Sequence, residues 1–191
     1  MEVVPTARAL TEADGRATDH DDLDALRSRS PDAVARLVRR TEPAVRRLVS
    51  RILAWSDETP DVVQDIYATA IVNLPGFRGG SAIETWLMRI AINRCRRHLR
   101  RRRFVDWVRR PRPPSPAADE PVDRSETNLA VRNAVAALPA RYREVVVLRY
   151  LEERSTRETA EILGERVNTV EVRLHRARGM LESALEHLAH D

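Results

Sequence analysis

The sequence predicts an all-α protein: two small helical domains joined by a flexible, proline-rich linker. The second is expected to be a four-helix domain with a helix-turn-helix (winged-helix-like) motif. Apolar residues recur every three or four positions on both sides of residues 104–125, which is typical of amphipathic helices. No pair of alternating apolar and polar runs flanks a hairpin turn, so strands are not expected. Residues 104–125 interrupt the helical pattern with a cluster of prolines, which indicates a linker.

Charge is unevenly distributed along this chain. All 33 basic residues of the 191 are arginine, yet the net charge is only +4. A locally concentrated positive charge favours a confined surface for a polyanion. The lone Cys95 excludes an internal disulfide and suits a reducing compartment. No apolar run reaches the ~18 residues that would span a bilayer, so we expect a cytoplasmic protein without membrane insertion.

The first domain is expected over residues 21–103, after a disordered tail of residues 1–20. Proline marks the start of its helices, because proline suits the first helical position. Pro31 follows a serine cap, Pro43 is expected to restart the helix, and Pro60 opens the next helix. The apolar stripes of these helices predict a core for the domain.

A glycine-rich loop and an arginine-rich helix end this domain. Phe77 lies between glycines, so we expect it to be more exposed than a core aromatic residue. On the following helix a stripe combines Arg89, Asn93, Arg96 and Arg100. Such a stripe can simply be a solvated face. Its closeness to Phe77 and Trp86 favours single-stranded nucleic acid, since bases stack on aromatic rings while arginine neutralises phosphates.

The second domain is expected over residues 126–191, with its helix-turn-helix at about 155–178. Ser155 and Glu158 form a capping-box pattern, and Gly164 ends that helix. Asn168 is expected to cap the next helix. One face of this helix is apolar, and the opposite face carries Val172, His175, Arg176, Arg173 and Arg178. An arginine-rich face backed by an apolar stripe is typical of a recognition helix in a major groove.

Four segments, in this order, resemble the extracytoplasmic-function (ECF) sigma factors of bacterial RNA polymerase. Residues 61–65 (DVVQD) resemble the helix that binds core polymerase. Residues 77–81 (FRGGS) with 85–93 (TWLMRIAIN) resemble the promoter-melting segment. Residues 138–144 (LPARYRE) and 169–178 (TVEVRLHRAR) resemble the domain that reads the upstream promoter element.

The resemblance implies a transcription initiation factor without enzymatic activity or cofactor, whose partners are core RNA polymerase, promoter DNA and an anti-sigma factor. It assigns polymerase binding to Asp61, Gln64 and Asp65. It assigns −10 recognition and melting to Phe77, Arg78, Trp86, Arg89, Asn93, Arg96 and Arg97, and −35 recognition to Arg149, Glu171, Val172, Arg173, His175, Arg176 and Arg178.

Three positions depart from the family's usual pattern. Glu171 stands where a basic or small polar residue is commoner. Its carboxylate would repel phosphate and could accept a hydrogen bond from a cytosine amino group. Asn168 replaces a common glycine, and Thr159 a usual isoleucine. These departures affect the promoter sequence that is read rather than the class of protein.

The sequence leaves two alternative functions to consider. A DNA-processing enzyme would need a catalytic or metal constellation, and only His187 and His190 offer even a weak metal pair. A stand-alone helix-turn-helix regulator would explain residues 126–191 but not the loop and arginine-rich helix at 76–103. For a sigma factor, the proline-rich linker leads us to expect no fixed spacing between the domains.

Overall fold

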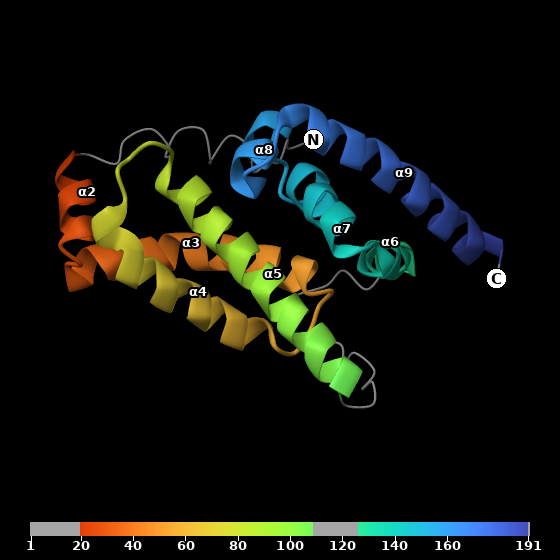
Figure 1. The fold of residues 1–191 in the computed structure, drawn as a ribbon, viewed down its shortest axis with the longest axis horizontal. Coiled ribbons are helices and arrows are strands. Elements are labelled where there is room, and N and C mark those ends of the chain that lie inside the picture. Colours follow the sequence, from red (N-terminus) through yellow and green to blue (C-terminus); the bar gives the residue numbers. More distant parts are fainter. Residues whose placement is uncertain (1–19, 109–125, 191) are drawn as a thin grey trace, which may run out of the picture.

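The computed structural model describes the backbone of residues 20–108 and 126–190, and the side chains of residues 23–102 and 129–186. The N-terminal half consists of α2 (His20–Arg27), α3 (Pro31–Ile52), α4 (Thr59–Asn73), a 3-10 turn (Leu74–Gly76) and α5 (Ile83–Val108). The C-terminal half consists of α6 (Glu126–Ala137), α7 (Ala140–Val146), a π-helical turn (Val147–Leu151), α8 (Thr156–Leu163) and α9 (Val167–His190). Neither described range contains a strand, so the all-α prediction is confirmed and no β wing is present there (Figure 1). The expected tail before His20 and the linker after Val108 lie outside these ranges.

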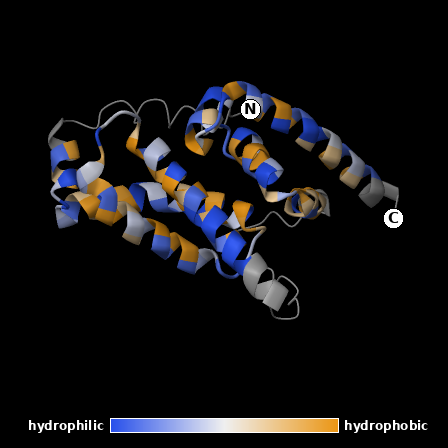
Figure 2. Ribbon diagram, viewed as in Figure 1, coloured by the Kyte–Doolittle hydropathy of each residue, from blue (hydrophilic) through white to orange (hydrophobic). Residues whose placement is uncertain are grey.

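Helices α3, α4 and α5 pack against one another and form the body of the N-terminal half (Figure 1). Their hydrophobic residues face a shared core, whereas α5 becomes hydrophilic toward its C-terminal end (Figure 2). Leu48, Ile66 and Leu87 are among the side chains that are almost completely buried in this core. A second, smaller cluster forms where α2 and the 3-10 turn pack against the start of α3. The loop before α5 is therefore attached to a packed base.

Two helix boundaries differ from those expected from the sequence. Pro43 does not restart a helix but lies inside the continuous α3. Proline there removes one backbone donor, and the burial of Thr41, Val45 and Leu48 on either side of it stabilises the uninterrupted helix. Helix α5 runs on to Val108, five residues beyond the expected domain end at 103. Residues 104–108 contain no proline or glycine, and the next proline is Pro111, so nothing in this segment ends the helix.

The core of the C-terminal half is α7 with the π-helical turn. Residues Val145 to Leu148 are buried on all sides, as the continuous apolar run predicts. α7 and α8 pack against α9, and α6 packs across α9 and α7. Glu144 directly precedes this apolar run and is itself only 3% exposed. A buried carboxylate requires a partner, and that partner belongs to the other half of the molecule.

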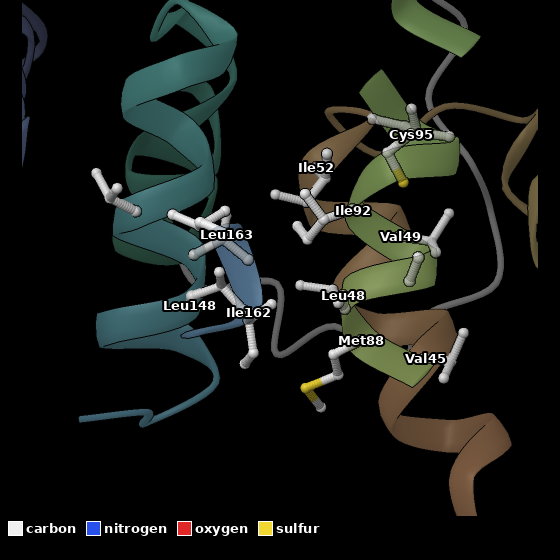
Figure 3. Close-up of a cluster of buried hydrophobic side chains, with 14 of the residues drawn as sticks. Val45, Leu48, Val49, Ile52, Met88, Ile92, Cys95, Leu148, Ile162 and Leu163 are labelled. Atoms are coloured by element: carbon white, nitrogen blue, oxygen red, sulfur yellow. The ribbon is translucent and has the colours of Figure 1, made fainter. Parts of the chain in front are cut away.

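The two halves pack directly against each other. A single hydrophobic cluster includes residues of both. In it, Leu48, Ile52, Met88 and Ile92 of α3 and α5 face Leu148, Ile162 and Leu163 of the C-terminal half (Figure 3). The expectation that the halves lack a fixed spacing is therefore wrong for this structure. The sequence pattern showed which faces are apolar but not that two of them meet.

Candidate nucleic-acid interface

The helix-turn-helix forms largely as its local sequence requires. Ser155 caps α8 by accepting a hydrogen bond from the Glu158 amide (3.2 Å), and the Glu158 carboxylate accepts one from the Ser155 amide (2.8 Å). Gly164 ends the helix in a left-handed conformation with φ 67°. Both predictions are confirmed. Asn168 is different: α9 already begins at Val167, so Asn168 lies in its first turn instead of capping it.

Helix α9 presents the expected outer face. Val170, Leu174 and Ala177 are buried, whereas the opposite side exposes Glu171, Val172, His175, Arg176 and Arg178. Val172 is 44% exposed. An exposed valine beside basic residues suits contact with a thymine methyl group in a major groove.

Three arginines of this region have partners within the C-terminal half. Arg173 is half-buried and donates to the Glu165 carboxylate at 3.0 Å. Arg149 is also half-buried, with its guanidinium 5.6 Å from the centre of the Tyr150 ring. A hydrogen bond from Arg176, with Arg141 nearby, lowers the pKa of the Tyr142 hydroxyl. The Arg176 side chain is therefore oriented from beneath by α7, although it reaches the surface.

The loop before α5 is built differently from the expectation. Phe77 is not exposed: only 5% of it is accessible, and its ring centre lies 5.2 Å from that of Trp86. The Arg27 side chain also donates to the Phe77 carbonyl at 3.0 Å. The apolar cluster beneath the loop, which includes Leu26 and Ile83, provides a site for the ring that the flanking glycines do not reveal. Phe77 thus supports the loop, while the neighbouring Arg78 is exposed.

The polar residues along α5 fall into two groups. Asn93 and Arg97 are exposed. Arg89, although exposed, donates to the Glu161 carbonyl at 2.9 Å. Arg96 is half-buried and makes two hydrogen bonds to Glu144, from Nε at 2.9 Å and from a terminal nitrogen at 2.6 Å. This two-point contact raises the pKa of Arg96 above its ordinary value.

The candidate polymerase-binding residues share one face of α4. Asp61, Gln64 and Asp65 are exposed, whereas Val62, Val63 and Ile66 between them are buried. The helical period alone explains this separation. The exposed face is acidic on a protein of net positive charge, so it differs from the arginine-rich face of α5. A basic surface of a protein partner would complement it.

Several residues that join the halves were missed by sequence reasoning. Arg51 donates to the Leu151 carbonyl (2.6 Å) and to the Glu152 carboxylate (2.7 Å), and Arg143 donates to the Ile52 carbonyl at 2.9 Å. One signal was available: Glu144 directly precedes the apolar run from Val145 to Leu148. A carboxylate in such a position needs a cation from elsewhere in the fold.

Comparison with known proteins distinguishes a sigma factor from a DNA-processing enzyme and from a stand-alone regulator. The sigma-70 region 2 family matches residues 37–105, and the sigma-70 region 4 family matches residues 128–181. The ECF sigma factor SigM of Mycobacterium tuberculosis is 34% identical over 161 residues, covering 82% of this chain and 79% of that protein. The chain belongs to the ECF sigma factor family. The sigma-E factor of Escherichia coli is 33% identical over 165 residues, covering 80% of this chain and 86% of that one.

Solved structures agree with this assignment. A Bartonella quintana sigma factor, RpoE, solved with the anti-sigma factor NepR, superimposes with a TM-score of 0.69 at 27% identity, covering 80% of this chain and 96% of that chain. CnrH, solved with the cytosolic domain of CnrY, gives a TM-score of 0.67 at 27% identity, covering 90% of this chain and 99% of that chain.

As a member of this family, the protein binds core RNA polymerase and directs it to promoters. It recognises the −35 and −10 elements and assists strand opening. A stand-alone regulator would not need the matched region at residues 37–105. Within the part of the chain that the structure describes, no helix is long and apolar enough to cross a membrane.

Proposed function

We propose that three separate faces of this sigma factor carry its three contacts. The acidic face of α4, with Asp61, Gln64 and Asp65, binds core polymerase. The loop and α5 act on the −10 element, and the outer face of α9 reads the −35 element. The observation that carries the proposal is that each helix has an exposed polar group opposite buried side chains. These exposed groups are Asp61, Gln64 and Asp65 on α4, Asn93 and Arg97 on α5, and His175 and Arg176 on α9.

Each face has the chemistry that its target requires. Arg89, Arg96 and Arg97 on α5 supply positive charge for a DNA backbone, and Asn93 supplies an amide that can pair with a base. His175 and Arg176 lie at the centre of the α9 face, where side chains reach base edges. Arg78, Trp86, Arg149, Arg173 and Arg178 surround these positions. Phe77 acts by supporting the loop.

The domain division follows the same logic. Residues 21–108 form the polymerase and −10 domain, since α5 continues to Val108; residues 109–125 connect it to residues 126–191, which form the −35 domain. Because polymerase performs the chemistry, the protein itself needs no catalytic group or cofactor. It works in the cytoplasm, where polymerase and DNA are found.

An anti-sigma factor is proposed as a further partner. Of the two similar structures described above, one contains a sigma factor with an anti-sigma factor, and the other contains CnrH with the cytosolic domain of CnrY. Their similarity extends over 80% and 90% of this chain. A partner that binds both halves would keep the DNA-reading faces from reaching a promoter.

The proposed division of labour is tested with purified core polymerase and genomic DNA. Sequencing the transcripts made with and without the protein should reveal start sites that share two upstream elements. Transcripts that share a −35 element but no −10 element would contradict the assignment of α5.

Substitutions on α9 should separate base reading from backbone binding. Arg176→Ala and His175→Ala are each expected to weaken promoter binding in a way that depends on the −35 sequence, by about 1–3 kcal/mol. Arg178→Ala should weaken binding to all promoters alike and reduce the salt dependence by about one phosphate contact. Binding across a library of −35 variants distinguishes the two patterns.

Tyr142→Phe is the matched control for Arg176. It removes the hydroxyl beside Arg176 but leaves the guanidinium available for DNA. If Tyr142→Phe weakened promoter binding as much, and with the same dependence on the −35 sequence, as Arg176→Ala, the orientation of the Arg176 side chain by α7 would be the main determinant of its effect. Equal losses across the library for Arg176→Ala, His175→Ala and Arg178→Ala would reject the assignment.

Asn93 should act in strand opening rather than in promoter association. Asn93→Ala is expected to leave the closed promoter complex intact and to reduce melting, because a flipped base costs a few kcal/mol and needs a pocket to offset it. Permanganate reactivity of thymines in the −10 region measures melting. Arg100→Ala, on the same stripe but outside the assigned set, is the control. Normal thymine reactivity in the Asn93 variant would contradict its role.

A further inference from the structure

The segment between α4 and α5 lies against α2, beside the turn that follows α4 (Figure 1). Leu26 of α2 shares a buried cluster with Leu74 and Phe77 at the start of this segment and with Ile83 at its end. Residues 78–82, between Phe77 and Ile83, are half-buried or exposed. The loop is therefore anchored on both sides, and α2 forms part of the anchor.

Arg29 has an uncommon backbone conformation for an arginine. Helix α2 ends in a Schellman motif, in which the Ser30 amide donates to the Ala25 carbonyl (2.9 Å) and the Arg29 amide donates to the Leu26 carbonyl (3.0 Å). The motif requires a left-handed residue, and Arg29 takes that position with φ 58°. Glycine is the usual residue there, because a side chain makes the left-handed region costly. Ending α2 does not by itself account for an arginine at this position.

The Arg29 side chain reaches the end of another helix. It donates to the Val72 carbonyl, in the last turn of α4, at 2.9 Å. Carbonyls of a last turn have no partner within their own helix, and a cation is favoured beside them. The last turn of α4 contains no basic residue of its own. Arg29 therefore supplies from α2 the cation that α4 lacks, and it fixes the point from which the loop begins.

Arg27 holds the same loop a few residues further on. Its Nε donates to the Phe77 carbonyl at 3.0 Å, and a terminal nitrogen donates to the Asp24 carboxylate at 3.0 Å. The bond to Asp24, one turn earlier in α2, orients the guanidinium toward the loop. Leu23 lies close by as well, since a Cβ atom placed on Gly79 would come 3.9 Å from its Cδ1. Helix α2 thus supports the loop from the end of α4 as far as Gly79.

We propose that Arg27 and Arg29 are positioning residues for recognition of the −10 element, which hold the loop of residues 77–82 in the orientation that presents Arg78 to DNA. They act through the loop and not by contact with DNA. This rests on the proposed function, which assigns the loop to the −10 element. A strained backbone conformation persists where the surrounding structure enforces it, commonly at ligand-binding sites. The hydrogen bond from Arg29 to α4 is what offsets the strain here.

Two replacements of Arg29 separate positioning from stability. Arg29→Gly relieves the left-handed strain and keeps the Schellman motif, but it removes the donor to the Val72 carbonyl. Arg29→Lys keeps the strain and retains a charged donor. If Arg29 affected only stability, the glycine variant would open promoters at least as well as the lysine variant. Positioning of the loop predicts the opposite order.

The first measurement is the mobility of the loop in the full chain, reported by a spin label on Gly80→Cys. A Cβ atom at Gly80 meets no other atom within 4 Å, and the native Cys95 is buried. The label should become more mobile in Arg29→Gly and in Arg27→Ala, whereas Arg29→Lys should stay close to the unaltered protein. Arg39→Ala, at an exposed position of α3, removes the same charge and should leave the mobility unchanged.

The second measurement is promoter opening with core polymerase, on a promoter identified by transcript sequencing. Permanganate reactivity measures the open complex, and a mobility shift measures the closed complex. Arg29→Gly and Arg27→Ala should each lower the ratio of open to closed complexes by about 2- to 10-fold, the equivalent of one hydrogen bond. Arg29→Lys and Arg39→Ala should keep the ratio. Urea denaturation should show Arg29→Gly to be at least as stable as Arg29→Lys.

The outcomes distinguish this inference from the proposed function. If Asn93→Ala impairs opening but Arg29→Gly opens the promoter as well as Arg29→Lys, the positioning role is overturned. An unchanged label mobility in both Arg29→Gly and Arg27→Ala would overturn it as well. If Arg78→Ala and Asn93→Ala both open the promoter normally, the −10 assignment itself fails. The role proposed for the two arginines then fails with it, even where the label shows that they hold the loop.

Discussion

Replacing Gln64 and Asp65 by lysine is expected to abolish the gain in promoter binding that core RNA polymerase confers. Both side chains are exposed on α4 between buried positions, so the fold should tolerate the change to within about 0.5 kcal/mol. In the unaltered protein the acidic face of α4 complements a basic partner surface. The new lysines would place like charges opposite that surface, which costs several kcal/mol of binding free energy across an interface. The loss should therefore be nearly complete.

A mobility shift on one promoter, with and without core enzyme at physiological salt, measures this effect. The protein alone should bind weakly and with little selectivity, since the packed halves hold the two reading faces at a distance set by their own contact, and core polymerase is expected to set the distance that a promoter requires. Glu182→Lys/Glu186→Lys, on the far end of α9, adds comparable positive charge and should keep the polymerase-dependent gain. A Gln64→Lys/Asp65→Lys protein that still gains selectivity from core enzyme would place the polymerase contact elsewhere. Tight, selective binding without core enzyme would indicate a free-standing regulator.

The parts of the structure that could be predicted from the sequence depend on neighbours a few residues apart. The capping box of Ser155 and Glu158, the left-handed Gly164 and the outer face of α9 all follow from local hydrogen bonds and the helical period. The same reasoning placed Gln64 and Asp65 on an exposed face. These features need no knowledge of how the helices pack together.

The parts that could not be predicted depend on contacts between distant segments. Arg96 and Glu144 are 48 residues apart in the chain, so the sequence pattern, which favoured nucleic-acid binding for this stripe, did not show that Arg89 and Arg96 bond to the C-terminal half. Pro43 was expected to break a helix that tertiary packing keeps continuous. The capping residue of α9 was placed two positions too late, since Asn168 is a good cap but the turn from Gly164 is shorter than expected.

Phe77 is the clearest case of a residue whose surroundings change its interpretation. Its flanking glycines suggested an exposed ring for stacking on a base. The ring instead packs on Trp86 and on the cluster around Leu26 and Leu37. Its contribution to melting is then indirect, because it holds the loop that carries Arg78.

Phe77→Ala should consequently be one of the most destabilising single substitutions in the N-terminal half. Removing a buried phenylalanine side chain costs about 3–5 kcal/mol, a large share of the roughly 5–15 kcal/mol that stabilises a typical domain. Phe77→Leu should retain most of the stability, since similar apolar volume is kept at a cost of about 1.5 kcal/mol or less. Arg78→Ala, one residue away and exposed, should change it by no more than about 0.5 kcal/mol.

Urea denaturation followed by circular dichroism measures these differences, and permanganate footprinting on the same proteins measures melting. If Phe77 supports the loop, melting should follow stability: Phe77→Leu opens the promoter nearly as well as the unaltered protein, and Phe77→Ala fails at temperatures where its loop is no longer packed. Base stacking predicts the reverse pattern, because leucine fills a cavity but offers no aromatic face to a base. A Phe77→Leu protein of normal stability that cannot open the promoter would therefore overturn the packing role and restore direct contact with the melted strand.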